Sequence, residues 1–233
     1  VGVFLGLGMS GGEPSELASM LDLCRTPDGE IDFAAMGREG LARLQPLLSF
    51  HVLPNMPLCH VSIELGLRGP HVALFAPGAE ALIAFDRAAA ALRRGEAEAA
   101  LCGGVDAPVN TLSLALSKTR APLAEGAAIA LVRAVDHPPT GAVVWRGLAA
   151  TESGIDDACR RTLGVALPRA WITIGGPNRA TLAGATSIVV LEDVVGETRA
   201  ASGALAIALA VRLLRTGERG VGILARGERG NYL

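Results

Sequence analysis

A glycine-rich turn near the start of the chain carries the first residues whose spacing could support chemistry. Residues 6–11 (GLGMSG) spell G-x-G-x-x-G, the spacing of loops that bring backbone amides to a pyrophosphate. The same turn spells G-x-S-x-G, which in hydrolases exposes a serine, here Ser10, between a strand and a helix. Residues 25–36 supply no clear strand with a ribose-binding acid, and His137 lies in a proline-rich turn. We therefore favour a structural turn and keep Ser10 as an alternative nucleophile.

The histidines and cysteines show no spacing typical of a metal site. His51, His60 and His71 are near one another in the sequence but lack the separations that ligands share. The cysteines are far apart and form no C-x-x-C pair: Cys24, Cys59, Cys102 and Cys159. Such cysteines are typical of buried, reduced thiols. We expect a cytoplasmic protein with no metal and no other cofactor.

The composition is apolar for a soluble protein. Hydrophobic residues make up 50% of the chain and charged residues 19%, and the mean hydropathy is +0.40. The longest apolar stretch, residues 203–214, is about a dozen residues long and contains Arg212, whereas a spanning helix needs roughly 20 apolar residues. No membrane span is predicted, so the apolar surplus indicates a large buried interface with a partner subunit. A net charge of −2 and 3% aromatic residues argue against nucleic-acid binding.

Apolar runs and helix signals alternate along the chain. Strands are predicted at 1–8, 71–76, 97–103, 126–132, 142–148, 170–174, 187–191 and 222–225. Helices are predicted at 14–23, 79–94, 154–163 and 200–216. Strands that are apolar throughout belong to sheets covered on both faces, and helices that are apolar nearly all round lie between layers. We therefore expect one α/β domain over 1–233, in which two sheets enclose buried helices and two pseudo-halves span about 1–136 and 140–233.

Several short blocks, in order, resemble the beta-ketoacyl synthases (ketosynthases), which condense acyl chains carried on acyl carrier proteins. The blocks match the family patterns NM, GLxGP, RxGxAD, AGGxE, LGEGAA and GASGA, and a last segment falls at the family's glycine-rich turn. They are residues 55–56, 66–70, 94–98, 102–106, 122–128, 201–204 and 226–231. The resemblance implies a thiolase-like, layered α-β-α-β-α fold, reduced relative to a full ketosynthase.

The same resemblance implies that the catalytic residues of the family are absent. Its nucleophile, a cysteine in an ACxTG turn between strand and helix, falls on Gly78, which has no side chain to acylate. Its lysine falls on Glu192 and its second histidine on Glu197, where a carboxylate would repel the negative charge of an enolate. The first histidine falls near residues 174–176 (IGG). We expect a protein that is not an enzyme on its own.

Ketosynthases are two-fold dimers, and polyketide systems contain a paralogue, the chain-length factor, which pairs with an active ketosynthase and shapes its acyl tunnel. The resemblance implies that this chain is such a subunit of fatty-acid or polyketide synthesis, with an active ketosynthase and an acyl carrier protein as partners. Val52, Leu53 and Met56 are expected to face the partner's tunnel, and Val72 and Leu74 to build the interface. The alternatives are a structural or regulatory pseudo-enzyme and an enzyme with relocated chemistry.

Overall fold

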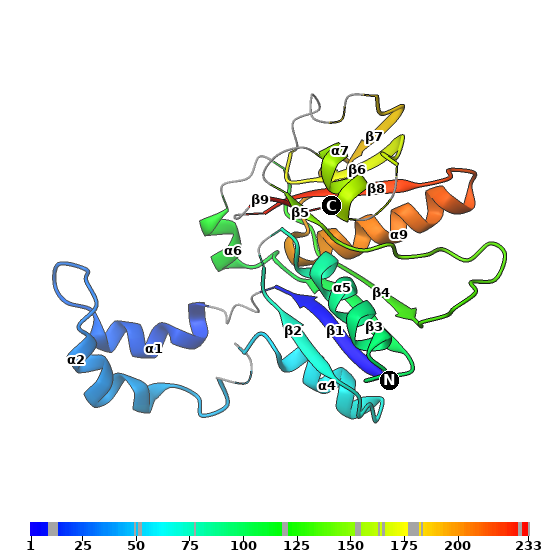
Figure 1. The fold of residues 1–233 in the computed structure, drawn as a ribbon. Helices are drawn as coiled ribbons and strands as arrows, with labels where there is room; N and C mark the ends of the chain where they lie inside the picture. Colours follow the sequence, from blue (N-terminus) through cyan, green and yellow to red (C-terminus); the bar gives the residue numbers. More distant parts are fainter. Residues whose placement is uncertain are drawn as a thin grey trace.

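The fold is described from a computed structural model of the chain. The described residues are 1–8, 14–48, 50, 53–76, 78–117, 121–151, 155–162, 164, 166–176, 182, 184–227 and 230–232. They form two sheets with helices between and outside them (Figure 1).

The first sheet has the strand order β2-β1-β3-β4. Strand β1 (Gly2–Leu7) lies in parallel between β2 (His71–Leu74) and β3 (Ala100–Asp106), and β4 (Gly126–Val132) runs antiparallel to β3. Every residue of β1 is buried, as its unbroken apolar sequence predicts. Strand β2 ends the sheet, and its His71 side chain is exposed, so the prediction that this strand is buried holds only in part.

The second sheet has the strand order β5-β9-β8-β6-β7. Its three parallel strands are β6 (Ala170–Ile174), β7 (Ser187–Val190) and β8 (Val221–Gly227). Two short strands, β9 (Gly230–Tyr232) and β5 (Ala150–Thr151), extend the sheet in antiparallel pairs. Residues 170–174 thus form the predicted strand with the predicted bounds.

Two apolar helices, α5 (Glu80–Arg93) and α9 (Ser202–Arg215), lie between the sheets (Figure 1). Helix α5 packs on β1 and β3, α9 packs on β4, β6 and β8, and the helices also contact each other. Their small residues allow this closeness: a Cβ on Gly203 would lie 3.2 Å from the Cβ of Ala81. The prediction of two sheets that enclose buried helices is confirmed.

Outer helices complete five layers. Helix α4 (Met56–Glu64) covers the outer face of the first sheet, where Leu58 joins the buried side chains of β1. On the second sheet, α7 (Ile155–Asp157) and η3 (Ala158–Thr162) pack around Trp171. Short helices also form at α6 (Thr111–Leu116), α8 (Leu191–Val195) and η5 (Arg199–Ala201).

Residues 14–48 form a helical arm that stands away from the two sheets (Figure 1). The arm contains α1 (Pro14–Cys24), α2 (Phe33–Ala35), η1 (Met36–Gly40) and η2 (Leu41–Arg43), which pack on one another. Met20 and Cys24 are buried in the arm, and a Cβ on Gly40 would lie 2.6 Å from the Cys24 sulfur. The arm therefore holds a small core of its own.

Some predicted elements differ in the structure. Residues 142–148 were predicted as a strand, but they pair with no strand. Instead, the ring of Trp145 packs against Phe85 at 5.6 Å between centroids, so the apolar residues cover α5 rather than join a ladder. The predicted strand 187–191 ends at Val190, and Leu191 begins α8. No helix in the described part of the chain has both the length and the apolar character needed to cross a membrane.

Replacing Gly104 with alanine tests the close packing between the sheets. A Cβ there would lie 2.5 Å from the Ala200 carbonyl oxygen and 3.0 Å from the Ala81 Cβ. We expect Gly104→Ala to lower the free energy of unfolding by about 1–3 kcal/mol, measured by denaturant titration. The control is Gly37→Ala in η1, where the new methyl meets nothing within 4 Å. Equal losses in both variants would contradict this account.

Candidate functional site

Gly78 forms the turn between β2 and α5. Its φ of +88° lies in the left-handed region that favours glycine. The Ala79 N–H donates to the Ala76 carbonyl at 2.9 Å and closes the turn. The first backbone N–H groups of α5 lack partners within the helix, so this turn presents donors to whatever lies next to it. The structure places Gly78 at a strand-to-helix elbow, but the residue supplies no nucleophile.

Glu80 is the first residue of α5 and is 8% exposed. It packs over β1, where a Cβ on Gly6 would lie 2.6 Å from the Glu80 Cβ. Burial raises the pKa of its carboxyl group from the usual 4.5 to about 7. The nearby Asp106 carboxylate raises this pKa further, whereas the backbone N–H groups of the elbow and of Glu80 itself lower it.

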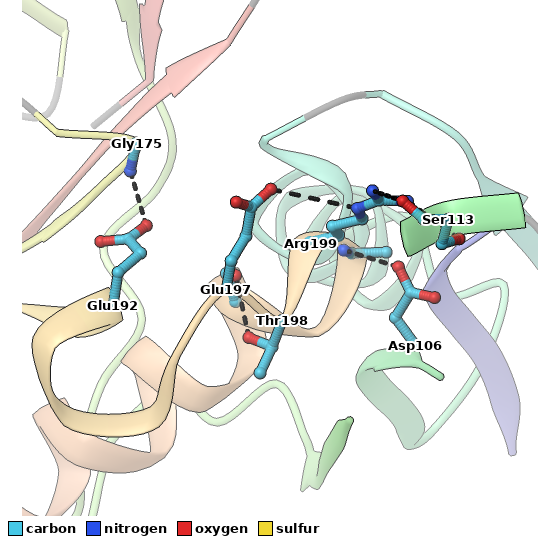
Figure 2. A network of polar contacts seen from close by, with 9 residues as sticks. Asp106, Ser113, Gly175, Glu192, Glu197, Thr198 and Arg199 are labelled. Atoms are coloured by element: carbon cyan, nitrogen blue, oxygen red, sulfur yellow. Dashed lines mark hydrogen bonds and ion pairs between the residues drawn. The ribbon is translucent and has the colours of Figure 1, made fainter. Parts of the chain in front are cut away.

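Asp106 ends β3 and is buried next to the same elbow. Its Oδ2 accepts a hydrogen bond from the Ala200 N–H at 3.2 Å (Figure 2). The space for this carboxyl exists because Gly8 has no side chain, since a Cβ there would overlap the carboxyl atoms. Burial raises the pKa of Asp106, although the Ala200 amide and the charge of Arg199 oppose the rise.

Arg199 joins this centre to helix α6. Its guanidinium donates from Nη1 to the Ser113 Oγ at 3.2 Å and from Nη2 to the Ser113 carbonyl at 3.4 Å (Figure 2). Its Nε lies 4.0 Å from the Glu197 Oε1, and both side chains are about one-third exposed, so the ion pair is weak. The φ of Arg199 is +44°, a strained value for a side-chain-bearing residue.

Glu197 is held by backbone hydrogen bonds to the segment that precedes β4. Its N–H donates to the Pro122 carbonyl at 2.9 Å, and its own carbonyl accepts from the Ala124 N–H at 3.1 Å. This pairing joins the block 122–128, which resembles ketosynthases, to the segment in which the second histidine of the family is expected. The Glu197 side chain shares the centre with Arg199 and Asp106 (Figure 2).

Glu192 lies in the first turn of α8 and reaches the end of β6. Its Oε1 accepts a hydrogen bond from the Gly175 N–H at 2.7 Å (Figure 2). Its Oε2 is buried and has no hydrogen-bond partner among the described residues. The structure thus brings together Glu192, at the expected lysine position, and residues 174–176, where the first histidine was expected.

The other predicted site residues lie elsewhere. Val52 and Ser10 are outside the described residues. Leu53 is 42% exposed, and Met56 is half-buried where it begins α4. Val72 and Leu74 are half-buried against the main core of their own chain.

Three of the cysteines, Cys24, Cys102 and Cys159, are buried, and Cys59 is half-buried. Burial raises the pKa of Cys102 to about 12, which leaves its thiol protonated and unreactive. Among the residues described, no group of histidine, cysteine and carboxylate side chains is arranged to hold a metal ion.

Sequence reasoning did not identify Glu80, Asp106 and Arg199 as parts of the site. Glu80 could have been found, because the ACxTG pattern that places the nucleophile at Gly78 has threonine two positions later. Asp106 ends the recognised block 102–106. Nothing in the sequence indicated that Arg199 bonds to Ser113, 86 residues earlier.

Comparison with known proteins identifies the family. Residues 1–136 match the family described as Beta-ketoacyl synthase, N-terminal domain. The chain belongs to the beta-ketoacyl synthase family. It is 29% identical over 117 residues to 3-oxoacyl-[acyl-carrier-protein] synthase 2 of Staphylococcus aureus, which is 49% of this chain and 25% of that relative. The aligned region thus spans about a quarter of the curated relative.

Solved ketosynthases share the fold. A type II polyketide ketosynthase complex, AntDE:AntF, matches with a TM-score of 0.71 and 15% identity, over 99% of this chain and 73% of that chain. The ishigamide ketosynthase/chain length factor matches with a TM-score of 0.55 and 20% identity, over 99% and 70%. These matches confirm the predicted thiolase-like layered fold, smaller than a full ketosynthase.

Replacing Glu80 with glutamine tests the buried carboxyl group. The pKa of Glu80 is raised in the folded state to about 7, so folding favours the protonated form. The stabilisation contributed by the protonated Glu80 carboxyl group is complete below its pKa in the unfolded state, about 4.5. It is lost as the pH rises through its pKa in the folded state, about 7. The difference of about 2.5 between the two pKa values corresponds to about 3 kcal/mol. Relative to the wild type, the free energy of unfolding of Glu80→Gln should therefore rise by up to that amount between pH 4.5 and 8.

Denaturant unfolding of both proteins across this pH range measures the difference. Asp106, the other buried acid, titrates in both proteins and so contributes to both curves. The matched control is Glu64→Gln, which removes the same carboxyl group at the exposed end of α4. A constant difference between Glu80→Gln and the wild type would show that Glu80 does not titrate as described.

Proposed function

We propose that this chain is a non-catalytic ketosynthase-like subunit of the chain-length-factor type, which pairs with an active ketosynthase in fatty-acid or polyketide synthesis and shapes its acyl tunnel. The observation that carries the proposal is the elbow. The turn between β2 and α5 has a left-handed φ at Gly78, where the nucleophile of the family is expected, and glycine supplies no side chain there. Acyl transfer onto the protein requires a nucleophile at this point.

The charges around the elbow support the same conclusion. Glu80 begins α5 at the elbow with the Asp106 carboxyl group nearby, and Arg199, which acts on Asp106, lies 4.0 Å from the Glu197 carboxylate. Condensation builds negative charge on a thioester oxygen, which hydrogen-bond donors stabilise and carboxylates oppose. On this proposal, the chain keeps the fold of the family at this place and lacks its condensation chemistry.

The free edge of the first sheet supports pairing with another subunit. Strand β2 ends the sheet and contains no Asp, Glu, Lys, Arg or Pro, the residues that normally protect an edge strand. Phe75, directly after it, is 46% exposed. Because Val72 and Leu74 face their own core, we propose that they contribute through the backbone edge of β2 rather than through side-chain contacts.

The helical arm, residues 14–48, adds apolar surface on the same side. It projects past β2, away from the rest of the first sheet (Figure 1). Its exposed apolar side chains are Leu23, Phe33, Leu41 and Leu47. A partner that continues the sheet at β2 would meet this arm, and the combined surface suits an obligate heterodimer.

The solved relatives illustrate the proposed assembly. The AntDE:AntF structure holds an acyl carrier protein in complex with its ketosynthase, bound to a hexaketide. The ishigamide protein is a ketosynthase/chain length factor. For this chain we propose an active ketosynthase and an acyl carrier protein as partners, in the cytoplasm, with no cofactor.

Replacing Ala73 with proline tests the edge. The Val3 N–H donates to the Pro70 carbonyl at 2.8 Å, so the backbone groups of Pro70 face β1. The backbone groups of successive residues in a strand point alternately to its two sides, so the N–H of Ala73, three residues later, points to the free edge. Ala73→Pro should remove that donor and weaken heterodimer formation at least about tenfold. The affinity is measured by adding increasing amounts of the chain to the partner ketosynthase and following the heterodimer by analytical ultracentrifugation.

The matched control is Ala73→Ser, which keeps the N–H and should pair as the wild type does. Undiminished pairing of the proline variant would remove β2 from the interface. A wild-type chain that stays monomeric beside the ketosynthases encoded with it would overturn the proposal.

Replacing Leu53 with phenylalanine tests the tunnel. Leu53 is exposed in the segment before α4, where we propose that it faces the partner's acyl tunnel with Val52 and Met56. A bulkier side chain should shorten the product by at least one two-carbon unit, as read by mass spectrometry of products from the co-expressed pair. The control is Leu65→Phe, at the far end of α4, about 13 Å along the helix.

An unchanged product in the presence of stable pairing would favour the alternative of a structural or regulatory pseudo-enzyme that docks a synthase or carrier protein. Turnover of acyl thioesters by the isolated chain would instead favour relocated chemistry, with Ser10, Glu192 or Glu197 as the candidate groups.

A further inference from the structure

Strand β4 (Gly126–Val132) is the free edge of the first sheet on the side opposite to β2 (Figure 1). It is seven residues long, and its sequence, GAAIALV, contains no charged residue and no proline. Edge strands of soluble proteins normally carry such residues, or a bulge, which prevent pairing with another chain. Strand β4 is paired with β3 in unbroken register along its whole length, so it lacks all three forms of protection.

The register of the sheet shows which backbone groups of β4 face the free edge. The Gly8 N–H, directly after β1, donates to the Val105 carbonyl at 3.2 Å, so the odd-numbered residues of β3 face β1. The even-numbered residues of β3 therefore bond to their partners in β4, which are also even-numbered. The N–H and C=O groups of Ala127, Ile129 and Leu131 thus point to the free edge. They form no backbone hydrogen bond to a described residue there.

The side chains of the same three residues form an exposed row on the outer face of the sheet. Ile129 is 51% and Leu131 is 55% exposed, whereas Ala130 and Val132, on the inner face, pack against the main core. Ile129 lies opposite Gly103 of β3, which has no side chain to cover it. Single exposed apolar residues are common on protein surfaces, but these lie side by side along an unpaired backbone edge.

Two opposite charges flank this row. Glu125 directly precedes β4 and Arg133 directly follows it, each four residues from Ile129 and each exposed. Neither side chain forms an ion pair with a described residue. If two β4 strands pair antiparallel about a two-fold axis between their Ile129 residues, positions equally far before and after Ile129 face each other. Glu125 of each copy then faces Arg133 of the other, and Ala127 faces Leu131.

We propose that the β4 edge binds a second copy of this chain, with the two strands antiparallel about a two-fold axis at Ile129. In this register the residues that face each other are those whose backbone groups point to the free edge, so each facing pair exchanges two hydrogen bonds. A small side chain, Ala127, faces a larger one, Leu131, and an ion pair closes each end. A two-fold interface must be self-complementary, and this strand is complementary to itself in charge and in side-chain size.

The other free edge does not share this pattern. The chain contains no acidic residue between Glu64 and Glu80, so two β2 strands would bring no opposite charges together. Charge complementarity therefore favours a second copy at β4 and a different partner chain at β2. The two edges lie on opposite sides of the sheet, so pairing at β4 does not depend on the proposed pairing with a ketosynthase.

Charge reversal tests the register. The isolated wild-type chain should dimerise as its concentration rises, as followed by analytical ultracentrifugation at low salt. Arg133→Glu and Glu125→Arg should each weaken the dimer at least about tenfold, because like charges then face each other at both ends of the pair. The double variant restores opposite charges and should dimerise as the wild type does. The control is Arg43→Glu, an exposed position in the helical arm, which should leave the dimer unchanged.

A cysteine at the two-fold axis tests the pairing directly. The Cα atoms of a hydrogen-bonded antiparallel pair lie about 5.5 Å apart, within the range that a disulfide spans. Ile129→Cys should therefore link two copies under mild oxidation, and peptide mass spectrometry should find position 129 joined to itself. The control is Ile63→Cys on α4, where the side chain is 77% exposed, and it should link at least about tenfold more slowly.

The substituted side chains are exposed, so the variants should fold, and rescue by the double variant separates loss of the interface from loss of the fold. A wild-type chain that is monomeric at about 100 μM would overturn the proposal. A dimer that both single charge reversals leave intact would also overturn it, because its interface would then lie elsewhere. Growth into large aggregates in place of a dimer, or the absence of the linked peptide, would do the same.

Discussion

The close approach of helices α5 and α9 to the first sheet is the constraint on which the rest of the structure depends. Gly6, Gly104 and Gly203 each lie where a single added carbon would meet a helix or its neighbour at 3.2 Å or less. This spacing lets two mostly alanine and leucine helices fill the space between two sheets at the packing density of a protein interior. It also fixes where α5 begins, and hence where the elbow at Gly78 lies.

The same closeness sets the electrostatics of the site. Glu80 and Asp106 are acidic residues at ends of regular elements, positions that are often solvated. Because Gly6 in β1 and Gly8 directly after it leave room for Glu80 and Asp106, both residues are buried, and burial raises the pKa of each carboxyl group. The resulting site contains two buried carboxyl groups and one arginine, Arg199, whose guanidinium is hydrogen-bonded to Ser113. Such a centre differs in charge and in chemistry from one that activates a thiol.

The proposed function requires that a ketosynthase scaffold persist while its chemistry changes, which is possible because the scaffold and the chemistry depend on different residues. The scaffold depends on small residues and apolar strands, which this chain keeps. The chemistry depends on a few side chains at element ends, and those can be replaced at little cost to the core. The kept elbow and the uncharged edge of β2 are the features that fit a subunit selected for pairing.

Much of the fold could be predicted from the sequence because its strongest patterns are local. The strand at 170–174 and the helices at 79–94 and 200–216 follow from apolar runs and helix-ending glycines. The prediction of a strand at residues 142–148 was wrong, because an apolar run is equally compatible with a buried strand and with an irregular segment that packs over a helix. The tertiary contact of Trp145 with Phe85, in another part of the chain, decides between these two structures.

For the site, the sequence by itself predicted which residues stand at the catalytic positions of the family, because the motifs occur in the family's order: Gly78, Glu192 and Glu197. Only the tertiary structure decided what surrounds them. The contacts of Arg199 with Ser113 and of Asp106 with Ala200 join residues about 90 positions apart. Such contacts depend on how sheets and helices stack, which no local pattern encodes. Burial, and with it the altered pKa of Glu80, is likewise a property of the packed layers.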